Sequence, residues 1–106
     1  MSKGYRLMWA EGALERLYEM LDTIAERSPA KAAKVRDQLM ARLALLPELP
    51  RMAPPFRLIP DPDIRQLVIE RFRLIYQVND EQELIILLAV QHGREDPTKA
   101  LVSDED

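Results

Sequence analysis

Residues 64–96 read IRQLVIERFRLIYQVNDEQELIILLAVQHGRED, and their pattern predicts most of a β-sheet. This stretch contains three short segments, 64–69, 72–78 and 84–91, whose alternating or continuous apolar residues are typical of β-strands. The polar residues 79–82 supply the turn between the last two strands. Strict alternation in the last strand predicts two apolar rows on opposite faces: Ile86, Leu88 and Val90 on one, and Ile85, Leu87 and Ala89 on the other. A strand that is apolar on both sides needs cover on both sides.

Upstream of this stretch the apolar period becomes helical. After a short strand at residues 5–9, apolar residues recur every three or four positions from Glu11, which predicts a helix of about four turns. Ser28 and Pro29 separate it from a second helix, because serine is a good N-cap and proline fits the first helical position. Pro47 ends the second helix. Six of the eight prolines lie between residues 47 and 62, so we expect a loop there.

The predicted order, β-α-α-β-β-β, gives an α+β fold in which a two-helix hairpin packs on a small, mainly antiparallel sheet. The 106 residues form one domain, 1–106, and residues 97–106 form a short C-terminal tail with a weak helix after Pro97 and a frayed end at 103–106. The helices cover one face of the sheet. We expect the other face to keep an uncovered apolar centre, bordered by Arg65 and Arg73, that binds a partner.

Composition restricts the classes of function. The chain has no cysteine and one histidine, so we expect no disulfide, no metal site and no cofactor. The N-terminus lacks a signal-peptide core and the longest apolar run, 84–90, is too short to span a bilayer, which favours a cytoplasmic location. The net charge of −3 comes from the tail, because removing Asp104, Glu105 and Asp106 leaves 15 acids against 15 Lys and Arg. A near-neutral body argues against direct, sequence-specific binding of nucleic acid.

Five motifs follow one another along the chain. They are WAEGA at 9–13, LALLPEL at 43–49, IRQL at 64–67, FRLIYQV at 72–78 and VQHGR at 90–94. In order and spacing they resemble the ParE/RelE superfamily, the toxin halves of bacterial type II toxin-antitoxin pairs, from about residue 7 to residue 96. Two positions depart from the family pattern: Ala10 stands where a Ser or Thr helix cap is common, and Pro50 where a glycine is common.

The resemblance implies a cognate antitoxin as partner and one of two targets. RelE-like members cut messenger RNA in the ribosome, whereas ParE-like members inhibit DNA gyrase by binding and are not known as nucleases. The chain has only four lysines and no tyrosine after Tyr76, whereas RelE-like members often carry basic residues or a tyrosine there, so we expect a ParE-like gyrase inhibitor and not an enzyme. The alternatives are a metal-free, ribosome-dependent endoribonuclease that uses Arg65, Arg73 and His92, and a degenerate member that binds its antitoxin without toxicity.

Candidate site residues follow from the resemblance and from the expected sheet. His92, Gly93 and Arg94 close the last motif and are the candidates for target contact. The candidates for antitoxin contact lie on the first and second of the three strands: Arg65, Arg73, Ile75 and Gln77. A structural alternative stays open for both sets, in which His92 and Arg94 only fix the end of the strand and the arginines pair with acids across the sheet, such as Asp63, Glu70 or Glu83.

Overall fold

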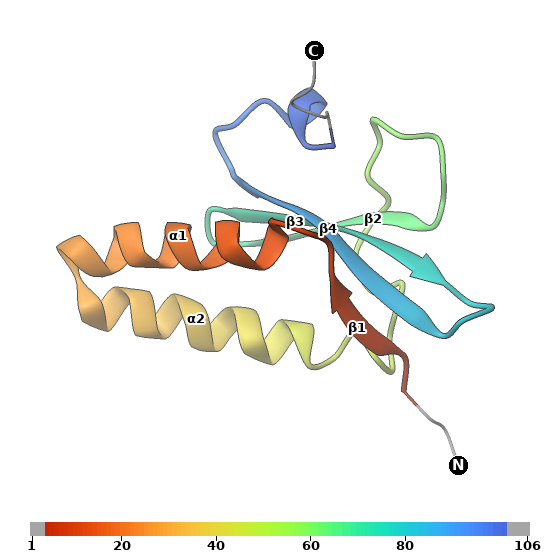
Figure 1. Cartoon of the computed structure of the whole chain (residues 1–106), viewed down its shortest axis with the longest axis horizontal. Coiled ribbons are helices and arrows are strands. Elements are labelled where there is room, and N and C mark those ends of the chain that lie inside the picture. Colours follow the sequence, from red (N-terminus) through yellow and green to blue (C-terminus); the bar gives the residue numbers. More distant parts are fainter. Residues whose placement is uncertain (1–3, 102–106) are drawn as a thin grey trace.

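The computed structural model describes residues 4–101 and contains the expected elements in the expected order. Four strands and two helices are joined in the order β-α-α-β-β-β, followed by a short 3-10 helix (Figure 1). Their bounds are β1 Arg6–Trp9, α1 Ala13–Arg27, α2 Pro29–Leu43, β2 Ile64–Ile69, β3 Phe72–Asn79, β4 Leu84–His92 and η1 Pro97–Lys99.

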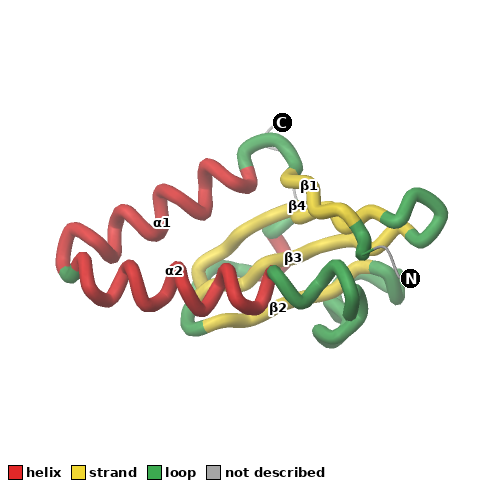
Figure 2. Tube along the Cα trace, turned by 90° about the horizontal axis from the view of Figure 1, so that it is seen from below, coloured by secondary structure: helices red, strands yellow, loops and turns green. Residues whose placement is uncertain are grey.

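The strands form one sheet in the order β1-β4-β3-β2. β1 pairs in parallel with β4, and the other two pairs are antiparallel, which confirms the mainly antiparallel sheet. Both helices lie on one face of this sheet (Figure 2). The connection between α1 and α2 projects beyond the edge of the sheet at which the β2–β3 turn lies (Figures 1 and 2).

The two helices begin and end differently. The N-cap of α1 is Gly12, whose φ of 84° is left-handed, and no side chain caps this end. Ser28 caps α2 as expected, because its Oγ accepts a 3.1 Å hydrogen bond from the backbone N–H of Lys31. α2 ends at Leu43, earlier than the expected stop at Pro47, and the residues between them form turns.

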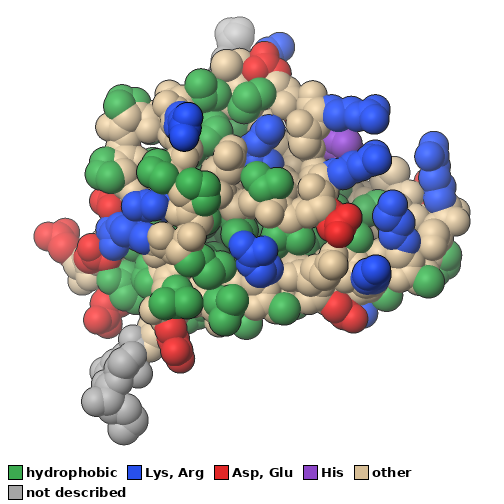
Figure 3. Space-filling view, turned by 180° about the vertical axis from the view of Figure 1, so that it is seen from behind, with side chains coloured by type: hydrophobic (Ala, Val, Ile, Leu, Met, Phe, Trp, Pro, Cys, Tyr) green, Lys and Arg blue, Asp and Glu red, His purple; other side chains and the backbone are tan. Residues whose placement is uncertain are grey.

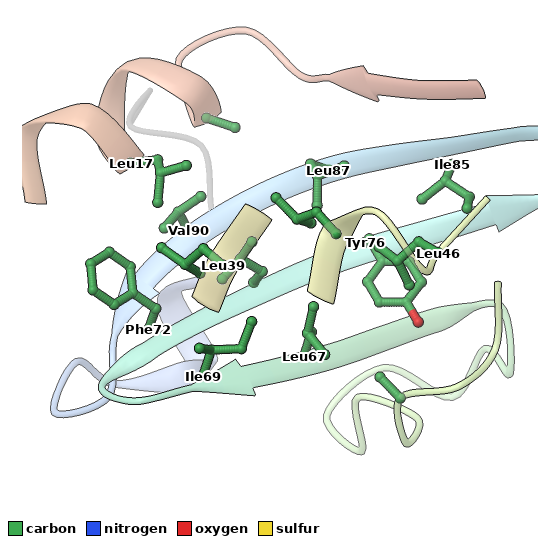
Figure 4. Packing of buried hydrophobic residues seen from close by; sticks show 14 of the residues in the cluster. Leu17, Leu39, Leu46, Leu67, Ile69, Phe72, Tyr76, Ile85, Leu87 and Val90 are labelled. Atoms are coloured by element: carbon green, nitrogen blue, oxygen red, sulfur yellow. The ribbon is translucent and has the colours of Figure 1, made fainter. Parts of the chain in front are cut away.

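The main core lies between the helical hairpin and the sheet. Buried leucines from both helices, such as Leu17 and Leu39, contact the strand residues that face them (Figure 4). Tyr76 is fully buried in this core, and its hydroxyl donates a 2.8 Å hydrogen bond to the carbonyl of Pro50. Burial also raises the pKa of this phenol above its ordinary value, so the tyrosine is a neutral core residue.

A β-bulge in β4 changes which side chains face the helices. Tyr76 pairs with Leu87 and the residue before it pairs with Ala89, so Leu88 has no partner in β3. One extra residue reverses the alternation of side chains beyond it. Val90 therefore joins Leu87 in the core under the helices, while Leu88 and Ala89 lie on the other face. The strict alternation expected from the sequence is wrong beyond this point.

The face of the sheet away from the helices, called here the second face, is covered. Ile75, a candidate for antitoxin contact, has no exposed surface because Phe56 and Ile59 of the 50–63 loop and Ala100 of the C-terminal segment pack around it. The expected uncovered apolar centre is therefore wrong. The proline-rich loop folds back over the sheet, and so does the segment after β4, and together they bury the apolar surface that the helices leave open.

Arg65 holds the loop in place. It lies opposite Tyr76 in the β2–β3 ladder, so its side chain is on the helix side of the sheet. Its guanidinium donates to the carbonyls of Ala53 at 2.9 Å and Pro62 at 3.0 Å. An isolated β-bridge between Pro55 and Arg65 adds a main-chain link. Each of these contacts ties the 50–63 loop to β2.

Arg51 ties the same loop to the β3–β4 turn. Its guanidinium forms ion pairs with Asp63 at 2.5 Å and Asp80 at 3.1 Å, and the hydroxyl of Tyr5 donates to Asp80 at 2.6 Å. The hydrogen bonds from Tyr5 and then from Arg51 lower the pKa of Asp80. The loop is thus fixed at both ends by charged groups on the surface.

Arg73 holds the C-terminal segment. It lies on the second face, opposite Gln91, and donates to the Gln91 Oε1 at 2.7 Å and to the carbonyls of Glu95 at 3.4 Å and Gly93 at 3.5 Å. The buried Gln91 in turn donates its Nε2–H to the carbonyl of Asp96 at 2.9 Å. Neither Arg73 nor Arg65 forms an ion pair with an acid within residues 4–101.

The tail is partly described. The short helix expected after Pro97 is the 3-10 helix η1, whereas the expected frayed end, 103–106, lies outside the described residues. Within residues 4–101, no helix is long and apolar enough to cross a membrane.

The covered second face predicts opposite outcomes for two neighbouring positions. Ile75→Asp is expected to lower the free energy of unfolding by more than about 4 kcal/mol, because the new carboxylate is buried without a partner. Val68 points to the same face on β2 but is 53% exposed, so Val68→Asp is expected to cost about 1 kcal/mol at most. Urea denaturation followed by circular dichroism measures both. A small loss for Ile75→Asp would show that the second face is open in solution.

Candidate functional site

A groove opens where the helical hairpin passes the edge of the sheet. Its volume is about 660 Å³, and its walls are α1, the start of α2, the β2–β3 turn and the residues after β4. The floor is apolar and consists of Met20, Ile24, Val35 and Phe72. In the view from behind, lysine and arginine side chains gather at the end of the molecule that carries the histidine (Figure 3).

The rim of the groove is positively charged. Its cationic side chains come from two helices and two turns: Arg16, Arg27, Lys31, Arg71 and Arg94. Two acids, Glu70 and Glu95, also line it. Five cations against two acids leave an excess of three positive charges, although the formal charge of the whole chain is −3. This excess attracts an anionic group on a partner.

His92 stands at the inner end of this rim because of the bulge. It pairs with Phe72 at the end of the β3–β4 ladder, so its side chain is on the helix side of the sheet. The ring Nδ1 accepts a 3.2 Å hydrogen bond from the backbone N–H of Arg94, and the ring is half-buried. The hydrogen-bonded Nδ1 supports the structural interpretation of this histidine, which shapes the turn that follows.

Gly93 and Arg94 form the exposed part of the turn. The Gly93 N–H donates a 2.6 Å hydrogen bond to the carbonyl of Arg71, and a Cβ at this position would lie 3.3 Å from that oxygen. The glycine thus allows the turn to approach the β2–β3 turn closely. The Arg94 side chain lines the groove, is exposed, and has no hydrogen bond or ion pair within residues 4–101. It is therefore available for contact.

Glu95 closes the turn. Its Oε1 accepts hydrogen bonds from the backbone N–H of His92 at 2.7 Å and from the Arg16 guanidinium on α1 at 2.5 Å. The bond from the His92 N–H and then the bond from Arg16 hold the pKa of this carboxyl below its ordinary value. The turn of residues 92–95 is therefore fixed to α1 as well as to the sheet.

The structure does not bring all the predicted site residues together. His92, Gly93 and Arg94 are adjacent at the groove, as the sequence required. Arg73, Ile75 and Gln77 share the second face, but Arg65 is on the helix side. The expectation that Arg65 and Arg73 border one patch is wrong. Arg65 pairs with Tyr76 and therefore shares its face, whereas Arg73 pairs with Val68 and shares the face of that residue. Because side chains alternate along a strand, Arg65 and Val68, and hence Arg65 and Arg73, face opposite ways.

Several residues at the groove were missed by the sequence analysis. Arg16 and Glu95 are 79 residues apart, and nothing in their local pattern indicates that they meet. Arg27 and Lys31 lie on either side of the expected helix junction at Ser28, so the hairpin alone would have placed them near each other. Among the described residues, no group of three or more His, Cys, Asp or Glu is arranged to hold a metal ion.

A model of the family described as the ParE toxin of the type II toxin-antitoxin system, parDE, matches residues 7–97. The chain belongs to the ParE toxin family. It is thus a toxin of a type II toxin-antitoxin system within the ParE/RelE superfamily, which confirms the resemblance seen in the five motifs. The chain has no significant match among curated protein sequences.

Solved structures similar to this toxin include RelE toxins and their antitoxin complexes. The isolated E. coli RelE toxin has a TM-score of 0.65 and 26% identity, with 87% of each chain covered. The intact E. coli RelBE toxin-antitoxin complex gives 0.65 and 26%, covering 86% of this chain and 99% of that chain. A mutant of E. coli RelE in complex with an antitoxin RelBc peptide gives 0.64 and 25%, with 91% and 90% covered. These matches confirm the α+β fold expected from the sequence.

The lowered pKa of Glu95 predicts how the turn responds to pH. Because the folded-state pKa lies below the ordinary glutamate value of 4.5, the bonds to this carboxylate are fully present above pH 4.5 and are lost as the pH falls through the folded-state pKa. The amide NMR signals of His92 and Arg94 are expected to titrate together, with a midpoint below 4.5. Glu95→Gln should abolish this transition, and a transition that persists in this variant would assign it to another group.

Proposed function

We propose that this toxin inhibits DNA gyrase by binding it, that the turn at His92, Gly93 and Arg94 makes the contact, and that a cognate antitoxin neutralises the toxin in the cytoplasm. The observation that carries the proposal is the match to the ParE family over residues 7–97. In this proposal the toxin is a protein-binding inhibitor and not an enzyme.

The positions of the possible catalytic residues support an inhibitor. Cleavage of RNA without a metal needs a base, an acid and cations around one phosphate. Arg65 and Arg73 point to opposite faces of the sheet, and each guanidinium is occupied by backbone or amide oxygens. His92 uses its Nδ1 to shape its own turn. Three groups in such positions do not surround one phosphate.

Arg94 is the residue best suited to bind the target. It is exposed, and its side chain has no partner among the described residues. The turn that carries it is held by Arg16 of α1, by Arg73 of β3 and by the carbonyl of Arg71. A planar guanidinium can hold a carboxylate with two hydrogen bonds, which lysine cannot reproduce. The apolar floor beside it can bury a neighbouring apolar side chain of the target.

A RelE-like endoribonuclease is the second candidate, because the similar solved structures are RelE toxins. In that case the groove, with its excess of cations, would hold RNA, and Arg65, Arg73 and His92 would have to act from different faces. A toxin that has lost its activity and only binds antitoxin is the third possibility.

The antitoxin is proposed to contact the second face. RelE is seen in complex with its antitoxin, and with a peptide of it, in the similar structures. The candidates that remain accessible on this face of the toxin are the half-buried Arg73 and Gln77, whereas Ile75 is reached only if the covering segments move. Arg65 would contribute from the edge of β2.

Two parallel assays of the purified toxin separate the candidates. Wild-type toxin is expected to inhibit gyrase supercoiling of plasmid DNA, or to stabilise cleaved DNA, while messages in a translating extract stay intact. Arg94→Ala is expected to raise the half-inhibitory concentration about tenfold or more, because a charged contact at the centre of an interface is lost.

The matched control is Arg57→Ala, which removes an exposed arginine of the 50–63 loop and should leave inhibition unchanged. Codon-positioned cuts in the message with normal supercoiling would replace this proposal by the RelE-like one. An inactive wild type in both assays would favour the degenerate member.

A further inference from the structure

The turn that carries Arg94 depends on one side chain from a distant part of the chain. Arg16 lies in the first turns of α1, and its guanidinium reaches the Oε1 of Glu95 at 2.5 Å. The same oxygen accepts the backbone N–H of His92 at 2.7 Å, and the ring of that histidine accepts the N–H of Arg94 at 3.2 Å. A continuous series of hydrogen bonds therefore runs from α1 to the backbone of Arg94.

We propose that Arg16 is a positioning residue, paired with Glu95, that fixes the turn of residues 92–95 in the conformation that presents Arg94 to the target. The proposal rests on the proposed function of that turn. Arg16 is not assigned a contact with the target, and it acts through the carboxylate of Glu95.

Two features distinguish this ion pair from an ordinary surface pair. The Arg16 and Glu95 side chains are 41% and 40% exposed, so solvent screens the attraction between their charges incompletely. The carboxylate also accepts a bond from the backbone of the turn itself, so the pair orders main chain as well as side chains. The exposed pair of Arg36 and Asp37, at 3.3 Å between neighbours on α2, has no such link to the turn.

The Arg16–Glu95 ion pair also determines whether the positive charge of Arg94 is free at the groove. Glu95 is adjacent to Arg94 in sequence, and both line the groove. While Arg16 holds the carboxylate, Arg94 stays free for an anionic group of the target. Without Arg16, the carboxylate loses its bound cation, and Arg94 is the nearest arginine in sequence that could replace it. The loss of Arg16 thus both loosens the turn and gives Arg94 a competing partner.

The test compares Arg16→Ala, Arg16→Lys and the control Arg36→Ala. Arg16→Ala is expected to raise the half-inhibitory concentration against gyrase about threefold to fivefold, because a smaller fraction of molecules holds the turn in its competent form. Amide hydrogen exchange at His92 and Arg94 should accelerate by a similar factor. Arg16→Lys should recover most of the potency because it keeps the charge, and Arg36→Ala should behave as wild type. All four proteins are expected to melt within about 3 °C of one another.

These measurements distinguish a positioning role of Arg16 from a general effect on stability. They also test that role independently of whether gyrase is the target. Unchanged potency and exchange in Arg16→Ala would overturn the proposal, and so would an equal loss of potency in Arg36→Ala. Measuring the toxin dose that arrests growth of expressing cells for the same variants keeps the comparison valid for any target. If wild type arrests growth without affecting gyrase, the proposed target is wrong, while the ratio of Arg16→Ala to wild type in growth arrest still decides the role of Arg16.

Discussion

The single extra residue in β4 determines which side chains of that strand face the helices and which face the other side of the sheet. Without the bulge at Leu88, strict alternation would turn Val90 and His92 away from the helices and Gln91 toward them. With it, Val90 completes the core under α1 and His92 reaches the edge of the groove. Gln91 meets Arg73 on the second face and holds the segment that follows. The bulge thus places Val90 in the core, Gln91 where it holds the segment that covers the second face, and His92 at the candidate site.

The second constraint is the need to cover a sheet whose central strands are apolar on both sides. The helical hairpin covers one face, and the 50–63 loop and the C-terminal segment cover the other. Both covering segments have little regular structure, so arginine side chains bind their free carbonyl groups. This explains why Arg65 and Arg73, which look like functional cations in the sequence, are largely used within the fold.

Much of the fold could be predicted from the sequence, because the apolar periods are regular and the helix junction carries a clear cap and proline. The bounds of β2 were correct, and those of β3 and β4 were within one residue. Two predictions were wrong, the strict alternation in β4 and the uncovered second face, because apolar periodicity does not indicate either feature. A bulge is set by register with a neighbouring strand, and the path of a proline-rich loop is set by tertiary contacts. For the same reason the adjacent residues His92, Gly93 and Arg94 could be grouped in advance, whereas Arg16 and Glu95 could not.

The contact proposed in the cell is between gyrase and the groove beside the turn of residues 92–95. It is tested most directly by placing a photoreactive amino acid at Arg71, which lines the same groove without altering Arg94, and identifying what is cross-linked in living cells. The same substitution at Arg36, on the exposed surface of α2, is the control. The expected result is a cross-link from position 71, and not from position 36, to a gyrase subunit. A cross-link from position 71 to ribosomal RNA or ribosomal protein, with none to gyrase, would contradict the claim.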